Sequence, residues 1–134
     1  MARIPRIVGF ILGAAISRYL PAVLSLLALP AQADVYAPIK DEGQFRSLVS
    51  ARELRLGAFG ISLIIQTDGR ITGQAMGSAV TGTWAWRDGY FCREMFWNGI
   101  DIPYNCQLVE ARSAEVMRFT TDKGTGQSAA FDLQ

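Results

Sequence analysis

The feature that most constrains the fold is a series of short turn signals between segments of β-forming residues. Asp68-Gly69, Asp88-Gly89 and Asn98-Gly99 separate stretches rich in branched and aromatic side chains, and Gly77-Ser78 is a fourth such signal. Asp-Gly and Asn-Gly favour tight hairpins, because both central residues can adopt positive φ. Hairpins that follow one another directly leave no room for the crossover helix that parallel strands need. The sequence therefore predicts an antiparallel meander.

One short helix is expected before the meander. Phe45, Leu48 and Val49 share one helical face, Asp41 is the candidate N-cap, and the helix is expected to end at Ser50. The segments with strand character that follow are Glu53–Leu56, Phe59–Gln66, Ile71–Met76, Val80–Arg87, Tyr90–Trp97, Tyr104–Arg112, Val116–Thr121 and Ala129–Leu133. A short helix followed by about seven or eight antiparallel strands predicts a mainly β fold, either a small barrel or a tightly curled sheet.

Residues 1–33 have the pattern of an export signal. A basic start precedes a long apolar stretch, and Ala31-Gln32-Ala33 then supplies a small-x-small cleavage site. An uncleaved membrane anchor is the alternative, since about 20 apolar residues span a bilayer. However, Arg18 would cost about 2.5–3.5 kcal/mol near the centre of such a span. We predict a cleavable signal peptide, a single small β-domain over 34–134, a periplasmic or secreted location, and no stable membrane insertion after cleavage.

The charge and residue types of the expected domain exclude several functions. Without the leader, ten Lys and Arg face twelve Asp and Glu, so the net charge is near −2 and no basic stripe is present. Nucleic-acid binding is therefore not expected. The chain has no histidine, which removes Ser-His-Asp and Cys-His catalysis and His-bound zinc. We predict neither a cofactor nor a metal site.

Cys92 and Cys106 are the two cysteines of the chain. Their spacing does not fit a C-x-x-C redox motif, and they provide fewer ligands than a structural zinc site uses. An even number of cysteines in an exported chain favours a disulfide. We therefore predict one structural disulfide between them.

The hairpin that contains these cysteines allows a prediction of register. If Asn98–Ile100 form the loop, Trp97 lies opposite Asp101, Phe96 opposite Ile102 and Glu94 opposite Tyr104. Continuing this count places Arg93 opposite Asn105 and Cys92 opposite Cys106, with both sulfur atoms on one side of the sheet.

The hairpin across Asp88-Gly89 concentrates aromatic residues on one face. Alternation there places Trp84, Trp86, Phe91, Arg93, Met95 and Trp97 on the same side. This face is either the barrel core or a surface that binds a ligand. In the second interpretation Trp84, Trp86 and Trp97 supply apolar contact while Arg93 binds an anionic or carbonyl group. A cation–π contact between Arg93 and Trp84 would instead explain the arginine without a ligand.

Two further patterns have alternative explanations. Glu94, Asp88 and Asp101 are the carboxylates from which an enzyme could be built, in the manner of a paired-carboxylate glycosidase. The glycine-rich segment Asp122–Ser128 lacks both the Walker pattern and the dinucleotide fingerprint. A tight hairpin turn at Gly124 and Gly126 is the preferred interpretation of that segment.

Four segments carry a resemblance to known proteins: Arg52–Leu56, Gly82–Glu94, Tyr104–Val109 and Phe119–Gly126. Together they resemble a group of small exported bacterial proteins without an established role, and the match covers nearly all of residues 34–134. Some members of the group carry the name dihydrodipicolinate reductase. That activity requires a nicotinamide cofactor, a Rossmann strand–turn–helix and a histidine-containing stretch, none of which this sequence provides. The resemblance implies an exported β-domain and transfers no catalytic residue.

These observations favour a non-enzymatic domain that binds a small ligand or a protein partner in the cell envelope. A partner could add a strand at an exposed edge near Ala129–Leu133. The alternative is an enzyme. It would either use the carboxylates Glu94, Asp88 and Asp101 or be a dihydrodipicolinate reductase, as the name of some similar proteins suggests.

Overall fold

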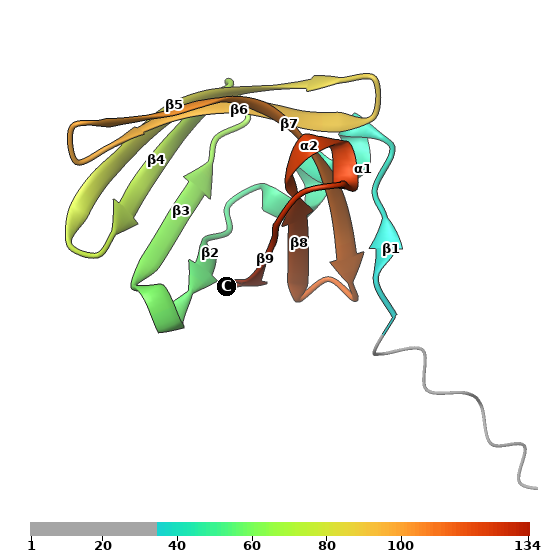
Figure 1. Ribbon diagram of the computed structural model, residues 1–134. Helices are drawn as coiled ribbons and strands as arrows, with labels where there is room; N and C mark the ends of the chain where they lie inside the picture. Colours follow the sequence, from blue (N-terminus) through green and yellow to red (C-terminus); the bar gives the residue numbers. More distant parts are fainter. Residues whose placement is uncertain (1–34) are drawn as a thin grey trace, which may run out of the picture. The chain divides into compact units, whose positions relative to one another are not determined.

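Residues 35–134 are the part of the chain that the structure, a computed structural model, describes (Figure 1). Their strands are β1 (Ala37–Pro38), β2 (Leu54–Leu56), β3 (Ile61–Ile65), β4 (Arg70–Ala75), β5 (Ser78–Arg87), β6 (Tyr90–Trp97), β7 (Ile100–Arg112), β8 (Val116–Thr120) and β9 (Ser128–Leu133). Their helical segments are α1 (Glu42–Val49), the 3₁₀ turn η2 (Gly57–Phe59) and α2 (Thr121–Gly124). In this part of the chain, no helix has the length and hydropathy needed to cross a membrane.

The strands close into a ring. They follow the order β7-β6-β5-β4-β3-β2-β9-β8, every pair is antiparallel, and β8 returns to β7. The ninth strand, β1, pairs with β7 beside the ring. The predicted mainly β fold is confirmed as a closed eight-stranded barrel with one extra strand and one disulfide. The predicted signal peptide, residues 1–33, lies outside the described residues.

Helix α1 has the predicted start and the predicted buried face. Asp41 is its N-cap and accepts a hydrogen bond from the Gln44 backbone N–H at 2.9 Å. Phe45 and Val49 are fully buried. Because a helix of this length is marginal in isolation, its stability comes from packing that face against the barrel interior.

The predicted register of the β5–β6 hairpin is confirmed. Arg87 pairs with Tyr90 across the Asp88-Gly89 turn, and Trp84 lies opposite Arg93. Strand alternation therefore places the predicted aromatic face, with Arg93 in its middle, on the inner side of the barrel.

The register of the β6–β7 hairpin is confirmed around the cysteines and corrected near the turn. Cys92 pairs with Cys106, and Arg93 with Asn105. The loop, however, is the two-residue turn Asn98-Gly99, with positive φ at both residues. The predictions that placed Trp97 opposite Asp101 and Phe96 opposite Ile102 are therefore wrong. The predicted pair of Glu94 and Tyr104 falls in the irregular stretch between Arg93 and Met95. Trp97 instead pairs with Ile100, Phe96 with Asp101, and Met95 with Ile102.

A β-bulge reconciles the two parts of this hairpin. Between the Met95 and Arg93 pairs, Glu94 on β6 faces two residues on β7, Pro103 and Tyr104. Proline cannot donate a ladder hydrogen bond, so a bulge is one of the few places in a sheet that tolerates it. The extra residue compensates for the shorter turn and restores the predicted pairing at the disulfide.

Three other local predictions differ from the structure. The turn between β4 and β5 is Met76-Gly77, where both residues have positive φ, rather than Gly77-Ser78. The start of the predicted strand Phe59–Gln66 belongs to the turn η2. The connection between β8 and β9 is longer than a tight hairpin and contains α2.

Candidate functional site

The three tryptophans of the predicted binding face occupy two different environments. Trp84 is buried, and its indole N–H donates to the Gln66 carbonyl at 2.8 Å. Trp84 and the half-buried Trp86 pack against Phe45, with ring centroids at 5.3 and 5.0 Å. Trp97 is half-buried further along the barrel, and its indole N–H donates to the Ala75 carbonyl at 2.8 Å. Trp84 and Trp86 therefore contribute to the core around α1, whereas Trp97 lines an apolar cavity.

Arg93 lies in the wall of a different cavity inside the barrel. This cavity has a volume of about 280 Å³. Most of its lining is apolar, and its polar lining residues are Arg93, Gln107, Thr121, Gln127 and Ser128. It combines a polar end with apolar walls, as small-molecule sites do.

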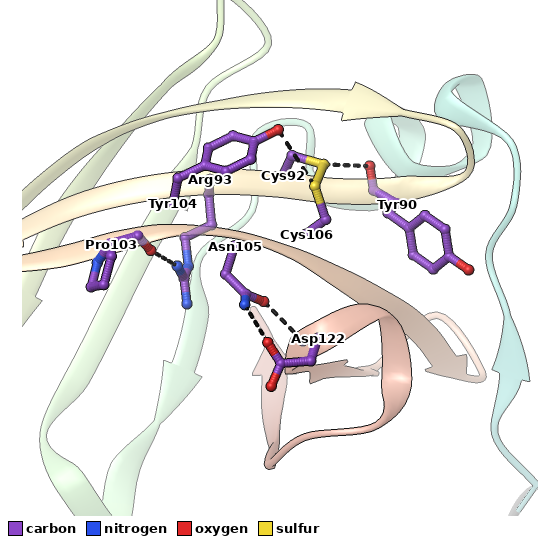
Figure 2. The surroundings of a disulfide bond; sticks show 8 residues. All are labelled: Tyr90, Cys92, Arg93, Pro103, Tyr104, Asn105, Cys106 and Asp122. Atoms are coloured by element: carbon purple, nitrogen blue, oxygen red, sulfur yellow. Dashed lines mark hydrogen bonds between the residues drawn. A yellow bond between two sulfur atoms is a disulfide. The ribbon is translucent and has the colours of Figure 1, made fainter.

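The Arg93 side chain is only 8 % exposed. One guanidinium N–H donates to the Pro103 carbonyl at the bulge, at 2.8 Å (Figure 2). Burial lowers the pKa of Arg93 from its ordinary value, since desolvation disfavours the charged form. Within residues 35–134, no carboxylate forms an ion pair with it. The cation over the Trp84 ring is Arg46, at 4.9 Å, so the cation–π contact considered for Arg93 is not formed.

Gln107 adds a second group to this polar end, and no sequence pattern singled it out. It lies on β7 opposite Phe91, diagonally across from Arg93, and is 8 % exposed. Diagonal neighbours on one face lie within reach of each other's long side chains. The Gln107 amide makes no side-chain hydrogen bond to any described residue. Within residues 35–134, every side-chain N or O atom that is shielded from solvent does have a hydrogen-bond partner. The free polar atoms of Arg93 and Gln107 are therefore accessible from the cavity.

The turn that contains α2 lies beside this polar end. Asn105 donates from its side-chain amide to an Asp122 carboxylate oxygen at 2.7 Å, and its amide oxygen accepts from the Asp122 backbone N–H at 3.0 Å (Figure 2). Asp122 and Lys123 both have φ of 54°, and Gly124 has φ of 100°. Left-handed non-glycine residues need such support from their surroundings. Asn105 thus holds a turn whose ends supply Thr121 and Gln127 to the cavity.

We expect Asn105→Asp to open this turn. An aspartate cannot donate to Asp122 and places a second carboxylate beside it, which removes a hydrogen bond to a charged group. Trypsin cleavage after Lys123 should become at least about tenfold faster, since such a bond contributes about 1.5–3 kcal/mol. Asn105→Ala is the matched control, because it removes the bonds without adding charge and should show a smaller increase. Equal cleavage rates for the wild type and Asn105→Asp would contradict this role.

Two of the three candidate catalytic carboxylates, Glu94 and Asp101, line the same cleft, and Asp88 lies apart from them. Glu94 and Asp101 are exposed and line an outer cleft with Tyr104. Asp88 lies in the β5–β6 turn, at the opposite end of β6 from Asp101. Among the described residues, no group of three or more Cys, Asp or Glu side chains could hold a metal ion.

The disulfide lies on the other side of the sheet from Arg93. Cys92 and Cys106 are bonded, as predicted, and the Tyr104 hydroxyl lies 3.4 Å from the Cys106 sulfur. Figure 2 shows the sulfur atoms on one side of the β6–β7 ribbon, with Arg93 and Asn105 directed to the other. The covalent link therefore joins the two strands that carry Arg93 and Gln107, without entering the cavity.

Comparison with protein families, curated proteins and solved structures gives no match. Fold and site together define a class: a small disulfide-bonded β-barrel with an interior cavity. Among the described residues, the arginine that lines one end of this cavity makes no ion pair and the glutamine beside it makes no side-chain hydrogen bond.

Proposed function

We propose that this protein is a non-enzymatic binding protein that holds a small molecule inside its barrel. The ligand carries an anionic or carbonyl group that accepts hydrogen bonds from Arg93. The single observation that carries this proposal is the 8 %-exposed Arg93, which lines an apolar-walled cavity and pairs with no acidic side chain in the described barrel.

A purely structural role explains Arg93 poorly. A buried charge costs several kcal/mol of desolvation unless a partner offsets it, and charged residues are almost never fully buried without one. The bond to Pro103 uses one donor, and no other described residue accepts a hydrogen bond from the rest of the guanidinium. A carboxylate or phosphate can accept two parallel N–H bonds from arginine. Such a ligand group would supply the partner that the fold omits.

We further propose that the protein works in the periplasm or is secreted. Two features support this location: the export pattern of residues 1–33 and the Cys92–Cys106 disulfide, because disulfides persist in oxidising compartments. The protein isolated from its own cells should have the mass of residues 34–134 less two hydrogens. A mass that retains residues 1–33 would contradict cleavage.

Native mass spectrometry of that material tests the binding function. The wild-type protein should carry an additional non-covalent mass, and Arg93→Met should lack it. Arg87→Met is the matched control, because Arg87 is exposed at the end of the neighbouring strand β5, and it should retain the additional mass.

Two results would contradict the proposal: no additional mass on the wild type, or the same mass on Arg93→Met. Arg93→Lys separates charge from geometry, since lysine keeps the positive charge but loses the bidentate fork. We expect Arg93→Lys to retain only part of the ligand occupancy. Thermal unfolding distinguishes this role from a structural one. Arg93→Met should melt at or above the wild-type temperature when both are free of ligand, because it removes a largely buried charge that has no ion-pair partner in residues 35–134.

A further inference from the structure

A second cavity lies beside the first. It has a volume of about 240 Å³. All its lining residues are apolar: Ile61, Leu63, Ala75, Met76, Val80, Met95, Trp97, Ile102 and Phe131. Three of these residues, Leu63, Met95 and Phe131, also line the cavity that contains Arg93. The two cavities are therefore neighbours that share a wall.

Of these two neighbouring cavities, the first contains the polar groups and the second is entirely apolar. Arg93 and Trp97 lie on the same face of β6, four residues apart, which corresponds to about 13 Å along a strand. Trp97 lies next to the Asn98-Gly99 turn, so the apolar cavity lies at the turn end of the hairpin. A molecule that fills both cavities would thus have its polar group at Arg93 and its apolar part directed toward this end.

The same end of the barrel exposes apolar side chains to solvent. Met76 is 65 % exposed, Phe59 is 59 % exposed and Ile100 is 53 % exposed. Phe59 lies next to Gly60, whose carbonyl accepts the Met76 backbone N–H, and Ile100 pairs with Trp97. Met76 also lines the apolar cavity. Of the three exposed residues, Met76 lines the cavity itself, and Phe59 and Ile100 lie near it through these backbone contacts.

We infer that the ligand is a monocarboxylate with a single acyl chain. Its carboxylate binds Arg93 and Gln107, and its chain extends past Met95 toward Met76 and Trp97. This inference rests on the proposed function and specifies the ligand of the same site.

The lining of the second cavity favours an acyl chain over a peptide or a sugar. A peptide backbone or a set of hydroxyl groups in that space would lose hydrogen bonds to water, and none of the apolar side chains there replaces them. An acyl chain carries no such groups. The flexible Met76 and Met95 side chains can also adapt to a chain of variable conformation.

Calorimetric titration of the purified, delipidated protein with acetate, butanoate, hexanoate, octanoate and decanoate tests this inference. Each added methylene should raise the affinity about three- to fourfold, as expected for burial of a CH₂ group, until the chain fills the second cavity. Octan-1-ol has a chain as long as that of octanoate but no carboxylate, so it should bind at least tenfold more weakly. Arg93→Met should reduce octanoate affinity at least tenfold.

A substitution in the apolar cavity locates the chain. Ile102→Glu should abolish the gain from chain length, because the half-buried Ile102 lines that cavity. Ile64→Glu is the matched control: Ile64 is 45 % exposed on β3 and absent from both cavities. It should leave the whole series unchanged.

The outcomes separate this inference from the proposed function. Arg93-dependent binding of acetate with no gain from chain length overturns the acyl chain and leaves the proposed function intact. If no alkanoate binds but native spectra still show an Arg93-dependent mass, the acyl chain is likewise overturned and the proposed function is left intact. Octanoate binding that is unaffected by Arg93→Met overturns the proposed function itself.

Discussion

Replacing Phe45 by alanine is expected to lower the free energy of unfolding by about 3–5 kcal/mol, the range for large-to-small substitutions of buried aromatic residues. Phe45 is fully buried. Its ring centroid lies 5.0–5.3 Å from those of Trp84, Trp86 and Phe91, so truncation leaves a cavity among three large rings. The lost aromatic contacts add to the lost burial.

Urea denaturation followed by tryptophan fluorescence measures this effect, because Trp84 and Trp86 pack directly against Phe45. Gln44→Ala is the control on the same helix: Gln44 is exposed, and its substitution should change the free energy by no more than about 0.5 kcal/mol. A loss below about 1 kcal/mol for Phe45→Ala would show that α1 does not contribute to the barrel core.

The strands and the start of α1 were predictable from local patterns, whereas the docking of α1 was not. Asp88-Gly89 and Asn98-Gly99 are strong turn signals because of backbone conformation within two residues. The N-cap at Asp41 is similarly local. That the helix contacts Trp84 and Trp86 depends on long-range packing, which no local pattern encodes. The sequence therefore left open whether these two tryptophans belong to the core or to a ligand surface, and in the structure they pack around Phe45.

The residues at the polar end of the cavity could be placed in part by counting strand pairs from the β6–β7 turn. Counting from the hairpin placed Arg93 on the inner face and opposite Asn105, both correctly. The same count also places Gln107 opposite Phe91, so its position was available from the sequence, although glutamine alone gave no reason to select it. The count failed at Trp97, because the turn is one residue shorter than predicted. The bulge at Pro103 adds that residue back, so the pairs beyond the bulge are the same as in the predicted register.

The turn at Asp122 and Lys123 could not be anticipated in the same way. Glycines at 124 and 126 suggested a tight hairpin, yet the positive φ values occur first at two non-glycine residues. They are stabilised by Asn105, which is distant in the sequence. Strain of this kind depends on tertiary contacts rather than on local propensity.

Removing the disulfide by the double substitution Cys92→Ala and Cys106→Ala is expected to lower the free energy of unfolding by about 3 kcal/mol. The cysteines are 14 residues apart in sequence, and closing a loop of about 15 residues contributes roughly this amount in the chain-entropy model. The effect is large relative to a total stability of about 5–15 kcal/mol. Urea denaturation of the wild type with and without a reductant should reproduce the difference, while the double variant should not respond to the reductant.

The effect of this variant on ligand binding separates stability from site geometry. The Cys92–Cys106 link and the Arg93–Asn105 pair are adjacent in the ladder, but the sulfur atoms face away from the cavity (Figure 2). The ladder pairs of β6 and β7 on both sides of the link hold Arg93 and Gln107 in register without it. At temperatures where the double variant remains folded, its octanoate affinity should therefore lie within about twofold of the wild type, since no cavity-lining group is altered. A tenfold loss of affinity in the folded variant would instead show that the disulfide positions Arg93.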